Sequence, residues 1–280
     1  MNAEKFKLGD LPLDLLEEAF REIKDYFTAF IIDNKLAGSG TFAKLDGVPG
    51  ILTARHVWDH VKQLAQKDPQ VGIMVTEKAH RFSIHVNNLV PTLNIQRLTD
   101  TFGPDLEFIK LPAADVGTIN ARKSFYELGA NTATKLAKAR DSYGICVVMG
   151  APAENVIQKQ NPLTKVRQTT VHVRGMILQR NSPKMKSGYD YWEMKTLSAV
   201  EGRPEDFGGV SGGGVWRLIL AKKRNQPMCA LKVTGCYLGG VAFYQSALKN
   251  GFRFLRSHGP ISIYRCVPEL FARNRQGMSL

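Results

Sequence analysis

The spacing of apolar residues changes early in the chain from a helical period to a strand-like one. Residues 11–24 carry apolar side chains at helical intervals with carboxylates between them, so the pattern predicts an N-terminal helix. Short apolar or alternating runs follow, separated by turn sequences such as Asp46-Gly47-Val48-Pro49-Gly50, which is typical of antiparallel strands. The first set of expected strands covers residues 26–32, 40–45, 51–53, 71–75, 82–86 and 106–111.

A second set of strand-like runs follows a basic, helical stretch at residues 131–140. These strands are expected at residues 144–149, 169–178, 191–196, 215–221, 231–238 and 240–244, before a closing helix at 268–273. The strands are not interleaved with the long helices that βαβ units require. The pattern predicts an all-β fold with helical termini, divided into an N-terminal helical extension at 1–24, a first lobe at 25–115, a connector at 116–143, a second lobe at 144–260 and a C-terminal helix at 261–280.

The composition is that of an ordinary globular protein. The chain has 280 residues, of which 44% are hydrophobic and 22% charged, which excludes a collagen-like or mainly unfolded chain. The apolar runs are strand-sized and fall short of the roughly 18 residues of a transmembrane helix. The first 24 residues are too charged for a secretory signal, so a cytoplasmic location is expected. The cysteines are sparse and form no C-x-x-C pair, which predicts reduced core thiols rather than disulfides or zinc ligands: Cys146, Cys229, Cys236 and Cys266.

The net charge of +13 is concentrated in the second half of the chain. From residue 217 onward there are eleven Lys or Arg residues and a single acidic one, Glu269. Such a surface attracts an anionic partner, whether nucleic acid, a membrane surface or an acidic protein. A basic surface that is merely solvated fits the same observation, so the charge does not identify a partner.

Two titratable residues stand at the ends of expected strands. His56 follows Thr53-Ala54-Arg55 at the end of the apolar run 51–53, where an imidazole can face a cleft and act as a general base. Asp105 heads the run 106–111, and a carboxylate near an imidazole can fix its tautomer and stabilise the imidazolium. Taken singly, each residue is equally compatible with a structural role.

The most informative stretch is rich in glycine and has one serine in its middle, Phe207-Gly208-Gly209-Val210-Ser211-Gly212-Gly213-Gly214-Val215. Glycine relieves steric limits so that backbone N–H groups can converge. The amides of Gly209 and Ser211 are therefore candidates for an oxyanion hole, which stabilises the charge of a tetrahedral intermediate. A structural loop or a phosphate nest is the alternative, although the stretch lacks the lysine of a P-loop and does not fit G-x-G-x-x-G.

Together these stretches follow the chain order of a known protease family. Thr53-Ala54-Arg55-His56, the strand that begins at Asp105, and Gly209-Val210-Ser211-Gly212-Gly213 resemble the corresponding motifs of chymotrypsin-like (trypsin-like) serine proteases, including stand-alone bacterial peptidase domains. The resemblance covers about residues 25–260. It implies two six-stranded antiparallel Greek-key β-barrels with the active site in the cleft between them. It also implies a serine endopeptidase that needs no cofactor or metal, with Ser211 as nucleophile, His56 as general base and acid, and Asp105 as the orienting acid.

The resemblance also suggests how a peptide substrate binds. Leu238, Gly239 and Gly240 are expected to belong to an edge strand that pairs with an extended peptide. Glu205 lies six residues before Ser211, the spacing of the acidic residue that selects Lys or Arg in trypsins. Glu107 replaces a small residue of the family pattern, and the sequence assigns it no role.

Other classes fit the sequence less well. An α/β-hydrolase needs an acid and then a histidine after the serine, but after Ser211 the only acidic residue, Glu269, follows the only histidine, His258. A zinc hydrolase built on His56 and His60 lacks the glutamate expected beside the first histidine. A catalytically silent protease-fold module that binds an acidic regulator or nucleic acid through its basic second half remains an alternative. By analogy alone, an active enzyme would serve as a bacterial stress or defence effector.

Overall fold

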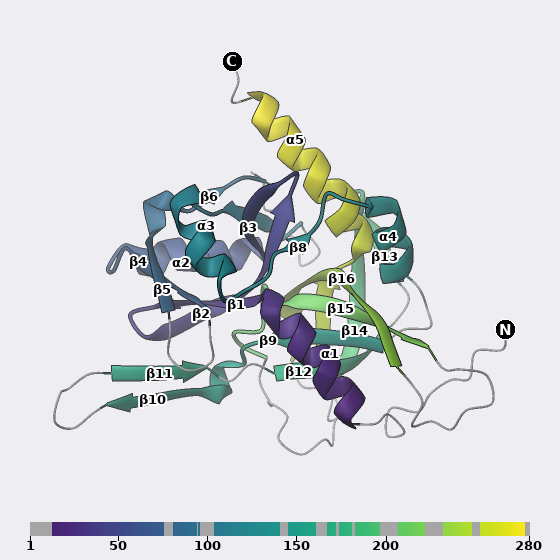
Figure 1. Ribbon diagram of the computed structural model, residues 1–280, viewed down its shortest axis with the longest axis horizontal. Coiled ribbons are helices and arrows are strands. Elements are labelled where there is room, and N and C mark those ends of the chain that lie inside the picture. The colour runs from purple at the N-terminus through teal and green to yellow at the C-terminus, as the bar shows by residue number, and fades with distance from the viewer. Residues whose placement is uncertain are drawn as a thin grey trace.

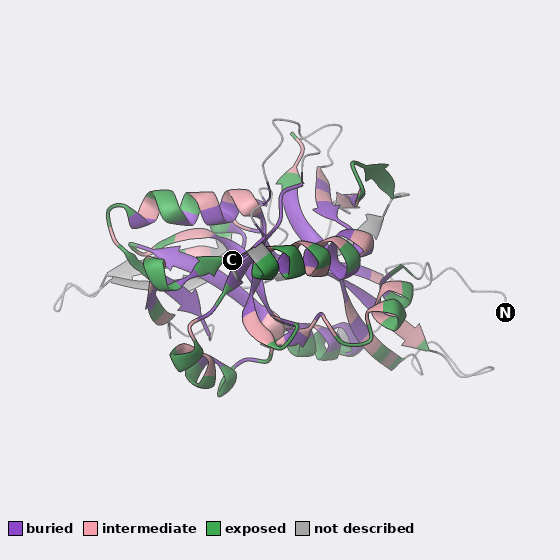
Figure 2. Ribbon diagram, turned by 90° about the horizontal axis from the view of Figure 1, so that it is seen from above, coloured by how far each residue is buried: buried purple, intermediate pink, exposed green. Residues whose placement is uncertain are grey.

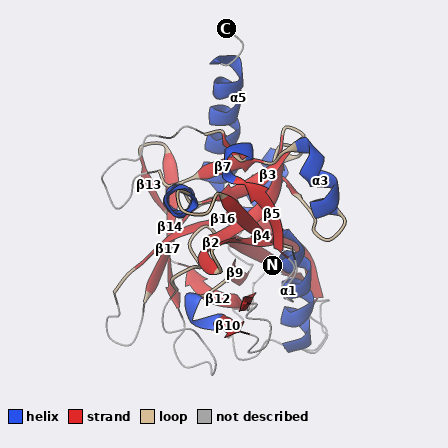
Figure 3. Ribbon diagram, turned by 90° about the vertical axis from the view of Figure 1, so that its left-hand side faces the viewer, coloured by secondary structure: helices blue, strands red, loops and turns tan. Residues whose placement is uncertain are grey.

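The computed structural model describes residues 13–75, 81–93, 95, 104–140, 145–160, 167–171, 174–180, 183–196, 207–221, 232–247 and 253–277. The protein is mainly β, with two large sheets and several helices around them (Figures 1 and 3). The prediction of a mainly β chain with helices near both ends is confirmed.

The first sheet is built from the N-terminal part of the chain. Its strand order is β5 (Arg81–His85), β4 (Gln70–Met74), β1 (Phe27–Ile32), β2 (Lys35–Leu45), β3 (Val48–Thr53), β7 (Glu107–Lys110) and β6 (Val90–Pro91), all antiparallel, with β8 (Tyr126–Glu127) parallel to β2. The β1–β2 connection is a tight hairpin in which Asp33 and Asn34 both have positive φ, at 47° and 60°. Asn and Asp tolerate this left-handed conformation, which matches the twist of the strands.

The second sheet contains the C-terminal strands. Its order is β12 (Arg174–Arg180), β9 (Ile145–Gly150), β15 (Gly214–Ala221), β16 (Lys232–Gln245), β17 (Phe254–His258), β14 (Tyr189–Thr196) and β13 (Lys184–Lys186). Because β12 also pairs with β14, the hydrogen bonding runs through six strands and returns to its start. A separate two-stranded sheet, β10 (Val156–Gln160) with β11 (Arg167–Val171), lies beside it (Figure 1).

Helices α1 (Leu13–Tyr26), α2 (Arg55–Ala65) and α4 (Thr132–Arg140) pack against the strands, whereas α5 (Val267–Gly277) extends away from the sheets towards the C-terminus (Figure 1). Helix α3 covers Ala113–Asn120, α5 continues the π-helical segment η5 (Ser262–Cys266), and two short 3-10 segments are η2 (Val86–Asn88) and η3 (Ala153–Asn155). Figure 2 shows buried residues along the sheets and exposed residues on the outer faces of the helices. Among the helices of the described residues, none has the length and apolar character needed to cross a bilayer.

Several details differ from the sequence predictions. Helix α2 was not expected, although its buried residues Val57, Trp58, Val61 and Ala65 recur at helical spacing. The run expected to form two strands at 231–238 and 240–244 is the single long strand β16. Within the described residues the two large sheets have eight and seven strands, where the family resemblance implied six each. Among the described residues, Cys146, Cys236 and Cys266 form no disulfide with one another, and Cys229 lies outside these residues.

Candidate active site

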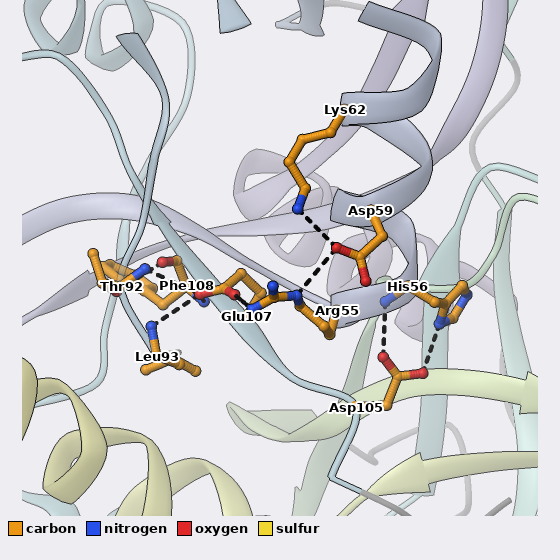
Figure 4. A network of polar contacts seen from close by, with 9 residues as sticks. All are labelled: Arg55, His56, Asp59, Lys62, Thr92, Leu93, Asp105, Glu107 and Phe108. Atoms are coloured by element: carbon orange, nitrogen blue, oxygen red, sulfur yellow. Dashed lines mark hydrogen bonds and ion pairs between the residues drawn. The ribbon is translucent and has the colours of Figure 1, made fainter. Parts of the chain in front are cut away.

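His56 and Asp105 form a hydrogen-bonded pair at the start of helix α2 (Figure 4). His56 Nδ1 lies 2.6 Å from Asp105 Oδ2, and the side chain of His56 keeps 29% of its surface exposed. Because an ionised carboxylate only accepts hydrogen bonds, Nδ1 carries the proton and Nε2 is left with a lone pair. The ring can therefore accept a proton at Nε2 from a group in the solvent-accessible space.

Asp105 also caps the helix that carries His56. Helix α2 has no side-chain cap at Ala54, so its first backbone amides need another acceptor. The amide of His56 donates to Asp105 Oδ1 at 2.9 Å, which places a carboxylate at the positive end of the helix. Burial opposes the ionisation of Asp105, but its hydrogen bonds with His56 outweigh that effect and hold the pKa of the carboxyl below its ordinary value. One carboxylate thus fixes the position of both the helix end and the imidazole.

A second histidine holds the backbone of Asp105 from the other sheet. The amide of Asp105 donates to Nε2 of His258 at 2.9 Å, and His258, at the end of β17, is fully buried. Burial lowers the pKa of His258 to about 3, although the charge of Asp105 acts in the opposite direction. The ring is therefore neutral, with its proton on Nδ1 facing Ser262 Oγ at 3.4 Å. Ser262 in turn donates to Asp190 Oδ1 at 2.9 Å.

The serine loop has a backbone conformation that only glycine adopts readily. Gly209 and Gly212, on either side of Ser211, both have φ of +86°. A Cβ atom on Gly212 would lie 2.0 Å from the carbonyl oxygen of Ser39 and 2.2 Å from Thr53 Oγ1, so there is also no space for a side chain. Glycine is required at this position for both reasons.

Three of the five backbone amides from Gly209 to Gly213 donate within the protein. Val210 donates to Phe207 O at 3.0 Å, Gly212 to Ala242 O at 2.7 Å and Gly213 to Val210 O at 2.9 Å. In the part of the chain that the structure describes, the amides of Gly209 and Ser211 have no partner. These are the two donors expected for an oxyanion hole, and they are available to a ligand.

Ser39 of strand β2 fastens the serine loop to the first sheet. Its amide donates to Ser211 O at 2.9 Å, its hydroxyl donates to Gly209 O at 2.7 Å, and the same hydroxyl accepts from the Ala151 amide at 3.1 Å. Thr53 Oγ1, at the end of the strand that leads into α2, donates to Ser39 O at 2.7 Å. The loop of Ser211 is therefore attached to the strands that carry His56.

The contacts of Gly38 place Ser211 near the start of α2. A Cβ atom on Gly38 would lie 2.6 Å from Val57 Cγ1 and 3.3 Å from Ser211 O. The carbonyl of Ser211 and the side chain of Val57, which directly follows His56, therefore both lie next to Gly38. Among the described residues, the Ser211 hydroxyl makes no hydrogen bond to His56, and the connection between them runs through the backbone.

Of the two expectations about substrate binding, the structure tests the edge strand and does not test the acidic residue. Glu205 lies outside the described residues. The expected edge strand at Leu238, Gly239 and Gly240 is wrong, because these residues are buried inside β16, which lies between β15 and β17. Leu238 pairs with Trp216 and Gly240 with Val215 on β15, while the opposite side is covered by Tyr264 and His258. These three residues offer no free edge to a peptide.

Sequence reasoning missed several residues that support the site. Ser39 lies between two glycines in a stretch Gly38-Ser39-Gly40, which is a signal for close backbone approach. His258 and Arg55 gave no signal, because their contacts depend on residues far away in the sequence. Arg55 is bonded to Glu107, which gives the unexplained carboxylate a partner.

Comparisons with known proteins do not assign the chain to a family. No family model matches it, and no curated protein matches it. One similar solved structure comes from work on the coupled folding and binding of the intrinsically disordered VPg protein of Sesbania mosaic virus. It is 11% identical, covers 87% of this chain and 90% of that chain, and has a TM-score of 0.43. This similarity is too low to establish a common fold, so the function is inferred from the geometry of the site.

Proposed function

We propose that this protein is a serine endopeptidase of the chymotrypsin-like type, in which the two large sheets correspond to the two β-barrels of that fold. The observation that carries the proposal is an oriented His56–Asp105 pair whose strands are bonded to a serine loop in which two amides have no partner among the described residues. The pair comes from the first sheet and the loop from the second, which agrees with an active site between two lobes.

The chemistry follows from the positions of the protons. Ser211 Oγ attacks the carbonyl carbon of the scissile peptide bond while Nε2 of His56 accepts the hydroxyl proton. Asp105 stabilises the imidazolium that forms, and the amides of Gly209 and Ser211 donate to the oxyanion. His56 then gives its proton to the leaving amine, and water hydrolyses the acyl-enzyme by the same steps in reverse roles.

The lack of a hydrogen bond between Ser211 and His56 among the described residues does not oppose this mechanism. Catalytic hydrogen bonds are often long without substrate and tighten in the substrate complex. The loop is held to strand β2 through Ser39 and the imidazole is held through Asp105, so both reacting groups lie on segments that are fixed by hydrogen bonds.

The test is covalent labelling by a fluorophosphonate probe, which reacts with activated serines. The wild-type protein is expected to take up one equivalent of probe, and the Ser211→Ala variant none. Ser83→Ala, which removes an exposed serine of strand β5, is the matched control and is expected to label like the wild type. If the wild-type protein and Ser211→Ala label equally, the proposed nucleophile is wrong.

Cleavage of an unfolded protein substrate, read by mass spectrometry, tests the reaction itself. New peptide termini that appear with the wild-type protein and not with Ser211→Ala would support endopeptidase activity. The residues before the cuts would also test the expected preference for Lys or Arg, which should weaken in Glu205→Gln. Absence of both labelling and cleavage would favour the alternative of a silent module that binds an anionic partner.

A further inference from the structure

We propose that Arg55 and Glu107 form a clamp that positions His56 against Asp105, and that Arg55 is a positioning residue of the candidate site. The Arg55–Glu107 clamp joins the same two segments as the His56–Asp105 pair, one residue earlier in the first segment and two residues later in the second (Figure 4). The inference deepens the proposed peptidase function and rests on it.

Glu107 is a fixed anchor for this clamp. Its side chain has no exposed surface, and its Oε1 accepts from the amides of Thr92 at 3.0 Å and Leu93 at 2.9 Å. Its Oε2 accepts from Arg55 Nη1 at 2.7 Å. Burial raises the pKa of the Glu107 carboxyl, while these amides and Arg55 favour the ionised form. Because both oxygens act only as acceptors here, the geometry fits the carboxylate.

Arg55 connects this anchor to the first turn of helix α2. Besides Glu107, its guanidinium binds Asp59 Oδ1 through Nε at 3.2 Å, one turn further along the helix. Asp59 also contacts Lys62 Nζ at 3.0 Å. The guanidinium is planar and its donors have fixed directions, so two partners determine its orientation. The start of α2 is therefore tied to strand β7 through Arg55 and Glu107, and to the segment just before β7 through Asp105.

Two links restrain the helix end more than one link does. With only the two hydrogen bonds between His56 and Asp105, the helix end can pivot about that one carboxylate, and Nε2 moves with the ring. A second link through Arg55 and Glu107 removes this freedom and fixes the direction in which Nε2 points. Misplacement of a catalytic group by about 1 Å costs on the order of 10²-fold in rate, so this restraint affects catalysis.

Stability alone does not account for the clamp. Removing two charges from water is costly, and replacing a buried ion pair by apolar residues is often neutral or stabilising. An ion pair directly beside the imidazole has, by contrast, a clear geometric effect. We therefore assign the Arg55–Glu107 ion pair the role of holding His56 in position.

The test combines a spectroscopic readout with kinetics. The proton on His56 Nδ1, in a 2.6 Å hydrogen bond, is expected to give a far-downfield proton NMR resonance that is assigned by its loss in Asp105→Asn. The variants are Arg55→Met, Arg55→Lys and the double variant Arg55→Met/Glu107→Gln. Lys62→Met is the matched control, because it removes an exposed cation from the outer end of the same network.

We expect Arg55→Met to shift or broaden the resonance and to lower kcat about 10-fold to 100-fold, with KM changed less than about twofold. Arg55→Lys should recover part of both effects. The double variant leaves no unpaired buried charge, so it should recover the melting temperature of the wild type without recovering the resonance or kcat. Lys62→Met should match the wild type in every measurement.

Two results would contradict the proposed role of the clamp. One is a His56 Nδ1 proton resonance that is unchanged in Arg55→Met. The other is a double variant that regains the resonance and kcat together with its melting temperature, which would make the pair purely structural. The resonance can be measured without substrate, so it tests the clamp independently of activity. A wild-type protein without peptidase activity would contradict only the proposed function.

Discussion

The two sheets hold their parts of the candidate site by different physical means. In the first sheet, His56 is fixed by charged side chains: Asp105 bonds it directly, and Arg55 and Glu107 lie beside it. In the second sheet, Ser211 is fixed by backbone shape, through glycines with positive φ and carbonyl groups bonded by Ser39. The first arrangement depends on ionisation and should respond to conservative changes of charge. The second arrangement depends on close packing around the glycines, so it should be disturbed by the addition of a single methyl group.

Asp105→Asn should have the largest effect, and it tests the side-chain arrangement. An amide can still accept from the His56 backbone, but its NH₂ group faces Nδ1 and favours the tautomer with the proton on Nε2. We expect kcat to fall on the order of 10⁴-fold with little change of the melting temperature. The kcat of Asp105→Asn is measured by steady-state peptide hydrolysis. Asp14→Asn, on the exposed face of α1, is the control. A loss of less than about tenfold would show that the pair does not orient the base.

Gly212→Ala tests the backbone arrangement. The left-handed φ costs an L-residue about 1–2 kcal/mol, and the added Cβ atom would overlap the carbonyl of Ser39. We expect the free energy of unfolding to fall by about 3–5 kcal/mol, measured by urea denaturation. Gly47→Ala is the matched control, since Gly47 also has positive φ but nothing lies within 4 Å of its Cβ position. Gly47→Ala should lose only the conformational part, about 1–2 kcal/mol, and an equal loss in both variants would mean that the close approach to Ser39 does not matter.

The pH dependence of stability tests the link between the sheets through His258. The pKa of His258 is about 3 in the folded protein against an ordinary value of 6.5, so below about pH 6.5 the unfolded chain binds a proton that the folded chain does not. The free energy of unfolding is therefore expected to fall by about 1.4 kcal/mol per pH unit as the pH decreases from 6.5 towards 3. The raised pKa of Glu107 acts in the opposite direction at the acidic end of this range.

The contribution of His258 is isolated by comparison with His258→Gln. Glutamine can accept from the Asp105 amide through its side-chain oxygen and does not titrate. Denaturation at a series of pH values should therefore give a flatter curve for His258→Gln, while His60→Gln, on the exposed side of α2, should follow the wild type. Parallel curves for the wild type and His258→Gln would mean that folding does not lower the pKa of His258.

The smallest effect is expected for Ser39→Ala, which tests the link from the first sheet to the serine loop. The change removes the bonds of the hydroxyl to Gly209 O, which is part-buried, and from the buried Ala151 amide. We expect a loss of about 1–2 kcal/mol in the free energy of unfolding and slower probe labelling of Ser211. Ser83→Ala serves again as the control, and unchanged labelling would show that the Ser39 hydroxyl does not shape the loop.

The sequence predicted the parts of this molecule that depend on local pattern. Strands with alternating or continuous apolar residues were found within a few residues of their true ends, as at β1, β9 and β15. The roles of His56, Asp105 and Ser211 stay predictions, but the structure does bring the three segments together. Helix α2 was missed because it begins at Arg55, with only Ala54 between it and β3, so no turn sequence separates the strand from the helix.

The parts that the sequence did not predict depend on the position of a strand within its sheet. The glycines at 239 and 240 indicate close packing, but they do not distinguish a central strand from an edge strand. In the central strand β16, Gly239 and Gly240 allow Trp192 and His258 to approach closely. The interpretation of these glycines as part of an edge strand was therefore wrong. The contact between His258 and Asp105 likewise depends on the register of β17 against β16, which no local pattern specifies.

The bonds that assemble the site connect residues that are far apart along the chain. Asp105 and His258 are separated by 153 residues, and Ser39 and Gly209 by 170. Closing such long loops costs chain entropy, and contacts of this kind form slowly and late in folding. During synthesis the ribosome must release His258 before Asp105 acquires its backbone partner. We therefore expect the site to form only after the second sheet has folded, so that a partly synthesised chain contains His56 and Asp105 without a complete site.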